Sequence, residues 1–169
     1  FYGAEHPAPE WLAKAVYGLP EVRRVAIADA TLIASPGCYP TSILLPLIPL
    51  LEAGLIDPRQ IIADSLSGVS GAGRNASLPF LYVECNESLR PYGVPKHRHL
   101  SEIEQELGLA NGSPVTVQFT PHLVPVNRGI LTTLYLAPAL GQADDFDQWT
   151  TAVAACLAKR YTDAPFVRI

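Results

Sequence analysis

The thiol best placed for chemistry in this chain is that of Cys38, within SPGCYPTS (residues 35–42). Pro36 fixes its own φ angle and Gly37 reaches backbone angles that other residues resist, so together they can aim Cys38 in one direction. We expect a strand to turn into a helix here, and a helix N-terminus favours the nucleophilic thiolate. By itself the motif does not decide, because free cysteine is more often a small, buried hydrophobe.

A histidine pair adds to this signal. Two of the four histidines, His97 and His99, lie in KHRHLSE (residues 96–102), just before a predicted helix. A histidine near a thiolate can hold it ionised and serve as general acid and base. A metal site at this His-x-His pair is disfavoured, because no second ligand cluster accompanies it. The competing interpretation is a helix-capping or core histidine, to which we assign His6 and His122.

A Gly/Ser loop, SGVSGAGR (residues 67–74), follows a predicted strand. Its Ser70–Gly71 turn could offer backbone N–H groups to an anion. The loop matches neither the GxxxxGK[ST] phosphate loop nor the GxGxxG dinucleotide turn, so an ordinary flexible loop explains it equally well. Arg128 could pair with a carboxylate in bidentate geometry, although a solvated arginine is the commoner outcome.

The elements that must position these groups include four predicted helices: 8–21, 38–53, 99–108 and 144–161. Pro46 and Pro49 cannot donate backbone hydrogen bonds, so we expect the second helix to kink or to start late. Ser101 and Glu104 form a capping box at the start of the third, and Gly108 ends it. The fourth begins acidic and ends basic, as the helix dipole prefers.

Short strands complete the predicted pattern: 23–28, 31–35, 60–71, 78–84, 114–124, 129–138 and 165–169. The segment PVNR (residues 125–128) is of hairpin length and predicts antiparallel pairing of the strands that flank it. Mixed helices and strands indicate an α+β or mixed α/β fold.

Composition narrows the class of protein. The 169 residues are 49% hydrophobic and 17% charged, which is typical of a packed globular domain. The net charge of −4, without basic runs, argues against nucleic-acid binding. Three widely spaced cysteines form neither a disulfide framework nor a zinc motif, and they favour a reducing, cytoplasmic setting. The longest apolar run is too short to span a membrane. The chain contains no methionine, so we expect its natural start to lie elsewhere.

Four motifs in order carry a family resemblance: SPGCYPT, SGVSGAGR, YGVPKHRHLSEIEQEL and FTPHLVPVNRGILTT. With the opening HPAPEWLAKAVYGLPE, nearly the whole chain resembles the N-acetyl-γ-glutamyl-phosphate reductases, relatives of the aspartate-semialdehyde dehydrogenases. The resemblance implies a dinucleotide-binding lobe followed by a catalytic and dimerisation domain, built on a mixed, largely antiparallel sheet packed with helices. Residues 1–34 would be a remnant of the Rossmann lobe, and residues 35–169 a catalytic domain incomplete at its C-terminus.

The resemblance also implies an activity. It is the NADPH-dependent reduction of N-acetyl-L-glutamyl 5-phosphate to the 5-semialdehyde in arginine biosynthesis, with release of phosphate through a thioester on Cys38. The histidine partner falls on His99, which leads into the helix, with His97 as the alternative. Substrate anions would bind to arginines: Arg98, Arg74 and Arg128. Ser70 and Gly71 are the candidate cofactor contacts, and most of the NADPH site would lie in a lobe outside this chain. A homodimer or homotetramer is implied.

The chain departs from the family in three ways. Ser35 stands where the family usually has asparagine. The glycine-rich nucleotide fingerprint is expected before Phe1, and the family sequence is expected to continue past Ile169. We therefore expect the isolated piece to be deficient in NADPH binding and turnover.

Three other functions remain open from sequence. A related reductase would act on aspartyl or aminoadipyl phosphate. A cysteine hydrolase would use Cys38 and His99 without a cofactor. A non-catalytic oligomerisation module would bury Cys38 and use the strands at 114–124 and 129–138 as its interface.

Overall fold

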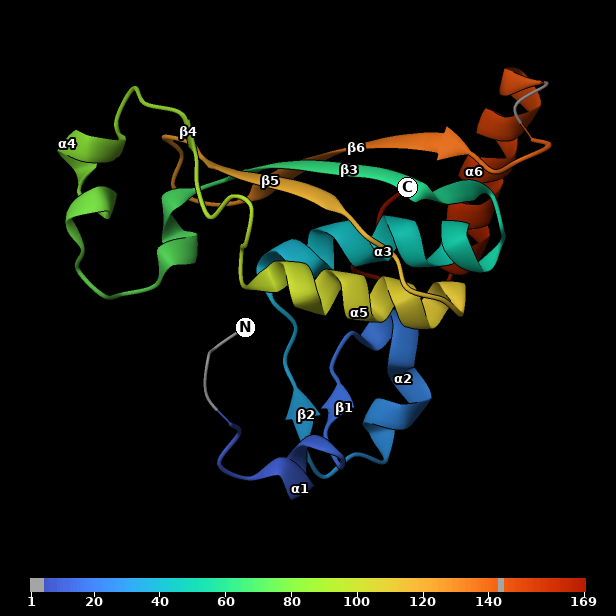
Figure 1. The fold of residues 1–169 in the computed structure, drawn as a ribbon, viewed down its shortest axis with the longest axis horizontal. Coiled ribbons are helices and arrows are strands. Elements are labelled where there is room, and N and C mark those ends of the chain that lie inside the picture. The colour runs from blue at the N-terminus through green and yellow to red at the C-terminus, as the bar shows by residue number, and fades with distance from the viewer. Residues whose placement is uncertain (1–4, 143–144) are drawn as a thin grey trace.

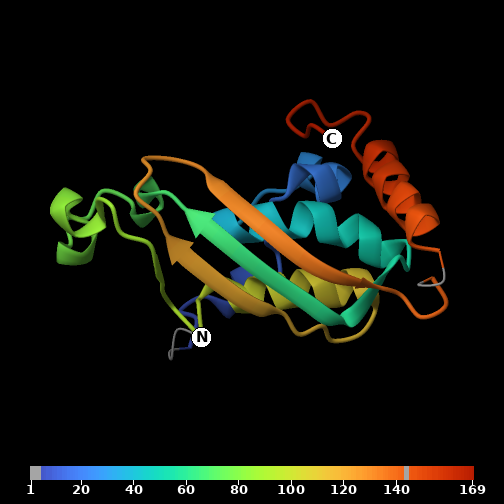
Figure 2. The ribbon, with the colours of Figure 1, turned by 90° about the horizontal axis from the view of Figure 1, so that it is seen from above.

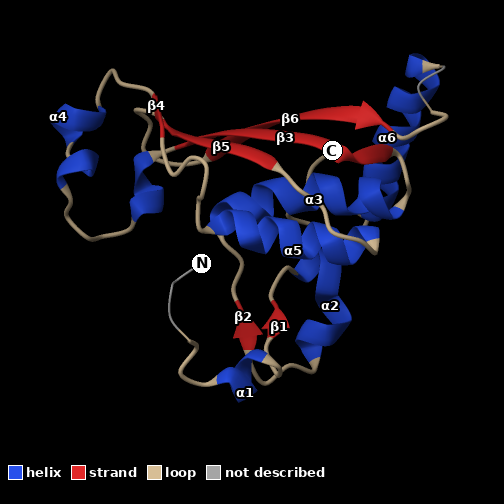
Figure 3. Cartoon of the chain, in the orientation of Figure 1, coloured by secondary structure: helices blue, strands red, loops and turns tan. Residues whose placement is uncertain are grey.

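The fold has two parts, a mixed sheet with helices beneath it and a smaller N-terminal unit below those helices (Figure 1). The computed structural model describes residues 5–142 and 145–169. The helices are α1 (Pro9–Leu12), α2 (Pro20–Ala28), α3 (Cys38–Glu52), α4 (Tyr82–Cys85), α5 (His99–Asn111) and α6 (Phe146–Arg160), with 3-10 turns η1 (Val69–Ala72) and η2 (Leu78–Phe80). The strands are β1 (Val16–Tyr17), β2 (Ile33–Ala34), β3 (Ile56–Ser67), β4 (Arg90–Pro91), β5 (Gln118–Leu123) and β6 (Ile130–Pro138). The predicted mixed α/β class is confirmed (Figure 3). The division at residue 35 stays a prediction.

The main sheet has the strand order β4-β5-β3-β6. β3 runs parallel to β5 and antiparallel to β6, and β4 is antiparallel to β5. The predicted hairpin between the strands at 114–124 and 129–138 is therefore wrong, because β3 lies between them (Figure 2). β3 is the central strand because its backbone pairs with β5 on one side and with β6 on the other. Its alternate residues Ile61, Ala63 and Ser65 are buried on the face that packs on the helices.

Helix α3 forms the core beneath the sheet. Most of its large aliphatic residues are almost completely buried: Ile43, Leu44, Leu47, Ile48, Leu50 and Leu51. The helix starts at Cys38 and continues through both internal prolines with no non-helical residue inside it, so the predicted late start is wrong. Pro49 cannot donate to the Leu45 carbonyl, and the Tyr161 hydroxyl donates to that carbonyl instead. Tyr161, the residue directly after α6, thus compensates for the proline.

Helix α5 packs beside α3 and is longer than predicted. It begins at His99, without the predicted capping box, and the Glu104 carboxylate accepts from the Val117 amide instead. Gly108 lies within the helix, which ends at Gly112 in the left-handed conformation (φ 72°). Gly112 provides the stop because only glycine adopts that conformation without cost.

Several short elements differ from the predictions. The helix predicted at 8–21 is limited to the four residues of α1. The strand predicted at 23–28 is part of α2, which Pro20 at its first turn favours. Residues 78–84 form η2 and α4 in place of a strand, and 165–169 form no strand. The strand at 31–35 is present as β2. Helix α6 starts after Asp145, whose carboxylate accepts from the Gln148 amide, as a helix cap does.

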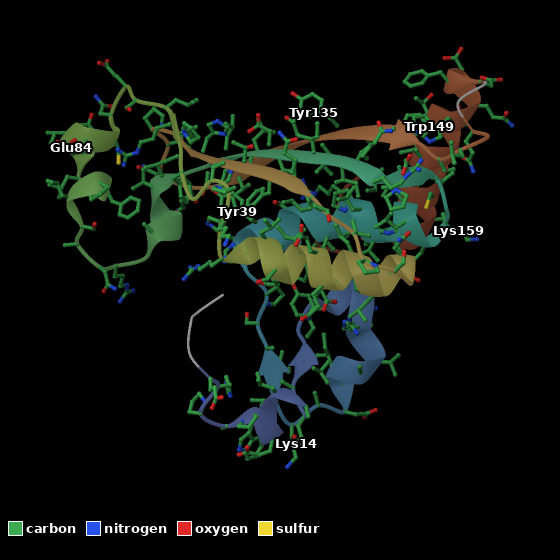
Figure 4. All side chains as sticks on the ribbon, in the orientation of Figure 1. Lys14, Tyr39, Glu84, Tyr135, Trp149 and Lys159 are labelled. Carbon is green, nitrogen blue, oxygen red and sulfur yellow. The ribbon has the colours of Figure 1, made fainter. Side chains whose placement is uncertain are left out.

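No element of the described residues covers one face of the sheet. Figure 2 looks onto this face, and the helices lie behind the strands. Tyr135 stands on it and points away from the helices (Figure 4), together with the exposed Ile62 and Leu131. Among the residues that the structure describes, no helix has the length and apolar character needed to cross a membrane.

Candidate active site

The thiol of Cys38 is exposed at the first residue of α3. Gly37 is the N-cap, and its carbonyl accepts from the amide (3.1 Å) and the hydroxyl (3.0 Å) of Thr41. Within the described chain, the amides of Cys38 and Tyr39 have no hydrogen-bond acceptor. Two free N–H groups at a helix start beside a thiol can bind an oxyanion.

A cleft of about 230 Å³ surrounds this thiol. It brings together the predicted nucleophile, the histidine segment and part of the Gly/Ser loop. The lining residues are Cys38, Tyr39, Ser67, Gly68, Gly71, Ala72, Phe80, Tyr92, His97, Arg98 and His99. Three motifs that are far apart in sequence therefore line one cavity.

His99 lies directly against the nucleophile turn. A Cβ placed on Gly37 would come within 2.7 Å of His99 Nε2, so any larger residue there would displace the ring or the turn. His99 Nδ1 is buried and lacks a hydrogen-bond partner among the described residues. Burial lowers the pKa of His99, while the carboxylate of Glu102 opposes that shift and Arg98 adds to it. The imidazole is therefore neutral at physiological pH and able to accept a proton.

His97 is held differently. Its ring makes edge contacts with Tyr39, Tyr92 and Phe119, at centroid distances of 5.4, 5.6 and 5.5 Å. Its Nδ1 accepts from the amide of His99 at 3.1 Å, which caps the start of α5. Burial, followed by the charges of His99 and Arg98, lowers the pKa of His97 to about 4. This histidine is engaged in packing and capping, which favours His99 as the proton carrier.

The three candidate arginines lie in two adjoining clefts. Arg98 lines the cysteine cleft. Arg74 and Arg128 line a second cleft of about 660 Å³ that shares Ala72 and Phe80 with the first. Within the described residues, none of these three guanidinium groups forms an ion pair. They are thus available to anionic groups of a ligand.

The Ser70–Gly71 turn does not supply the expected free donors. The Ser70 amide donates to the Asn127 carbonyl at 3.0 Å, and the Gly71 amide has only a long contact of 3.4 Å to the Gly68 carbonyl. Gly68 is required for this docking, since a Cβ there would lie 2.8 Å from the Arg128 amide. The Gly/Ser loop therefore serves to hold the Arg128 segment, and its backbone N–H groups are used within the protein.

Sequence reasoning missed Glu102. One oxygen of this carboxylate accepts from both the Gly37 amide (2.9 Å) and the Tyr17 hydroxyl (2.7 Å). The only signal in the sequence was its position three residues after His99 in a predicted helix, which places both on one face. Glu102 ties the nucleophile turn to the helix that carries the histidine.

The remaining two histidines do not line the cysteine cleft. His6 is exposed, and its Nδ1 accepts from the Ala8 amide at 3.1 Å. His122 lies 2.9 Å from the carboxylate of Asp64 on the sheet. No cluster of three or more metal-ligating side chains occurs in the described part of the chain.

The other two thiols are also outside this cleft. Cys85 is buried in α4, with its Sγ 3.2 Å from the Pro79 carbonyl. Cys156 is half-buried in α6, with its Sγ 3.5 Å from the Pro49 carbonyl. Of the three cysteines, Cys38 alone is exposed beside two histidines.

Comparison with known proteins identifies the class. The sequence model described as "Semialdehyde dehydrogenase, dimerisation domain" matches residues 38–169, so the chain belongs to this family. It is 56% identical over 169 residues to an N-acetyl-gamma-glutamyl-phosphate reductase from Akkermansia muciniphila, covering 100% of this chain and 47% of that protein. It is 54% identical over 169 residues to the enzyme of that name from Rhodospirillum rubrum, covering 100% of this chain and 46% of that protein. The chain spans about half the length of these relatives.

Solved structures support the fold. Aspartate semialdehyde dehydrogenase II from Vibrio cholerae superposes with a TM-score of 0.62 at 18% identity, covering 87% of this chain and 49% of that one. Aspartate semialdehyde dehydrogenase with NADP from Candida albicans gives a TM-score of 0.52 at 18% identity, covering 81% and 39%. At this identity the similarity establishes the shared fold only.

Proposed function

We propose that the protein carrying this chain is an NADPH-dependent reductase of N-acetyl-L-glutamyl 5-phosphate in arginine biosynthesis. The observation that carries the proposal is the exposed Cys38 at the start of α3 with His99 packed against the preceding Gly37. The identities above 50% to proteins of that name, over the full length of this chain, favour the acetylglutamyl substrate.

The first half of the reaction uses residues of this chain. His99 takes the proton of Cys38, and the thiolate attacks the acyl carbon of the substrate. A carbon–sulfur bond forms, the carbon–oxygen bond to phosphate breaks, and inorganic phosphate leaves with the electron pair and takes up a proton from solvent. The amides of Cys38 and Tyr39 stabilise the oxyanion of the tetrahedral intermediate. The result is a thioester, which divides one difficult step into two.

The second half releases the aldehyde. When bound, NADPH supplies the hydride that reduces the thioester carbon. The same two amides hold the oxyanion of the hemithioacetal while the carbon–sulfur bond breaks. Cys38 leaves as the thiolate, with the semialdehyde as product, and His99 returns the proton to the sulfur.

Anion binding is assigned to the arginines. Arg98 lies in the cysteine cleft, where it can pair with the phosphate or carboxylate of the substrate. Arg74 and Arg128 in the adjoining cleft fit the negative charge of substrate or NADPH. Ser70 lines that cleft and Gly71 lines the cysteine cleft, so both can make van der Waals contact with the cofactor. Most of the NADPH site is proposed to lie outside this chain.

The uncovered sheet face is the proposed self-association surface, since the family is a dimerisation domain. Exposed Ile62, Leu131 and Tyr135 give it an apolar centre. A homodimer or a homotetramer built from such dimers is proposed, and the cytoplasmic location stays a prediction.

One experiment tests the chemistry. The full-length protein is mixed with N-acetylglutamyl phosphate without NADPH, and peptides are examined by mass spectrometry. One equivalent of phosphate and an acyl adduct on Cys38 are expected, and adding NADPH should convert the adduct to aldehyde. Continuous phosphate release without NADPH would instead indicate a hydrolase. A stronger burst with aspartyl or aminoadipyl phosphate would reassign the substrate, and the lack of any adduct would contradict the proposal.

A further inference from the structure

We propose that Tyr17, in the N-terminal unit, is a positioning residue for the Cys38 thiol. Its hydroxyl and the Gly37 amide share one oxygen of Glu102, and this common acceptor holds the turn that presents the nucleophile. The role of Cys38 as nucleophile rests on the proposed function, whereas the hydrogen bonds to Glu102 are features of the structure.

The bridge joins three segments that are distant in sequence. Tyr17 is 85 residues from Glu102 and contacts it at 2.7 Å, and Gly37 is 65 residues from Glu102 and contacts it at 2.9 Å. Glu102 lies in the first turn of α5, the helix that begins with His99. One carboxylate therefore connects the N-terminal unit, the nucleophile turn and the histidine helix.

The Tyr17 hydroxyl is a permanent donor in this bridge. Burial raises its pKa far above the usual range, and the hydrogen bond and negative charge of Glu102 raise it further. The guanidinium of Arg23 lies over the ring, 6.0 Å from its centroid. Arg23 is in turn paired with the buried carboxylate of Glu106, one helical turn beyond Glu102. Tyr17 thus has little freedom to leave its acceptor.

The backbone also ties Tyr17 to the nucleophile turn. β1 and β2 pair in parallel, with Tyr17 opposite Ala34, and the Gly18 amide donates to the Ala34 carbonyl at 2.9 Å. A Cβ on Gly18 would lie 2.5 Å from the side chain of Ile33, so the two strands approach closely. Only the segment 35–37 separates β2 from Cys38. Two independent connections therefore fix the Tyr17 hydroxyl relative to the start of α3. One is the pairing of β1 with β2, and the other is the shared carboxylate oxygen of Glu102.

This geometry predicts a specific defect for Tyr17→Phe. Glu102 loses one of its two donors and can rotate away, so the Gly37 amide loses a fixed acceptor and the thiol samples directions away from His99. In the proposed function His99 takes the proton of Cys38, so alkylation of a thiol directed away from His99 should slow. General loosening of the fold would have a different signature, since it would expose the buried Cys85 and speed the alkylation of that thiol.

The test is iodoacetamide labelling of the full-length protein at neutral pH, with each cysteine followed by peptide mass spectrometry. Tyr17→Phe is expected to slow Cys38 labelling about fivefold, the value of one lost hydrogen bond, without faster labelling of Cys85. Tyr161→Phe is the matched control, because it removes a tyrosine hydroxyl bond to the Leu45 carbonyl, away from the site. Cys38 labelling should be unchanged in this control. Equal Cys38 rates in wild type and Tyr17→Phe would overturn the proposal.

A second pair of variants keeps the proposal testable if Tyr17→Phe does not fold. Glu102→Gln retains an oxygen acceptor for both donors, whereas Glu102→Leu removes it, so only the second should slow Cys38 labelling. Where Tyr17→Phe does fold, adding it to Glu102→Leu should cause no further slowing, since the acceptor is already gone. Additive slowing, or equal rates in Glu102→Gln and Glu102→Leu, would refute the bridge. Labelling needs neither substrate nor NADPH, so it succeeds or fails independently of the reductase assay.

Discussion

Two regions border the cysteine cleft, and they are held very differently. The wall formed by α3 and α5 includes the completely buried Ile43 and Ile103, and long-range hydrogen bonds fix its nucleophile turn. The arm (residues 73–89) projects beyond the end of the sheet (Figure 1), and its Tyr82 and Val83 are 76% and 79% exposed. Glu84 points outward from this arm (Figure 4). The comparison teaches that the proposed covalent chemistry lies on the buried wall, while the arm contributes Phe80 to the cleft.

The largest expected effect separates the two regions by their cysteines. Cys38→Ser on the wall should reduce kcat for acetylglutamyl phosphate by at least about 10³-fold, because the covalent intermediate cannot form. Cys85→Ala in the arm removes a thiol outside the cleft and should keep activity within about threefold. Steady-state NADPH oxidation by the full-length protein measures both. More than about 1% residual activity in Cys38→Ser would sink the nucleophile assignment.

The next effect tests how rigid the wall is. Gly37→Ala places a Cβ 2.7 Å from His99 Nε2, so the ring or the turn must shift. A displacement near 1 Å should lower kcat about 10²-fold. Gly108→Ala, in the same wall, is the matched control, because its Cβ would meet nothing closer than 3.6 Å. It should leave activity unchanged and stabilise α5 by about 0.5–1 kcal/mol. Equal activity in both variants would show that the wall yields easily.

A smaller effect concerns pH. The pKa of His97 is lowered from 6.5 to about 4 by burial, so the unfolded chain takes up a proton more readily than the folded one. The free energy of unfolding should therefore fall as pH drops from 6.5 towards 4. Above pH 6.5 the contribution of the neutral His97 to that free energy is complete. His97→Phe should flatten this dependence, whereas His6→Gln, at an exposed site, should not. Urea denaturation across this pH range measures it. An unchanged slope in His97→Phe would show that His97 does not cause the dependence.

The smallest effect is expected in the arm. Tyr82→Ser and Val83→Ser remove exposed side chains, so each should change the free energy of unfolding by no more than about 0.5 kcal/mol. Urea denaturation of the full-length protein, at low and at high protein concentration, measures the free energy of unfolding. A loss of several kcal/mol would mean that these side chains are buried in the assembled protein, and the contrast between arm and wall would then vanish.

Local patterns predicted much of this molecule. The turn before Cys38 was recognised from its proline and glycine, and α6 from its charge distribution, because both signals act over a few residues. Sheet order was not predictable in the same way: the four-residue link PVNR suggested a hairpin, but β3 inserts between β5 and β6. Likewise, 78–84 is apolar enough for a strand and yet forms short helices. Apolar runs of this length fit either structure, and only the neighbours decide.

The sequence by itself determined that this chain carries a candidate thiol nucleophile, a histidine pair and arginines in a family-specific order. The tertiary structure decided how they divide the work. It packed His97 among aromatic rings, placed His99 against Gly37, and brought Glu102 to Gly37 and Tyr17 from 65 and 85 residues away. The physical reason is range. Turn and helix signals depend on adjacent residues, whereas a carboxylate shared by three segments exists only once the core beneath the sheet has formed.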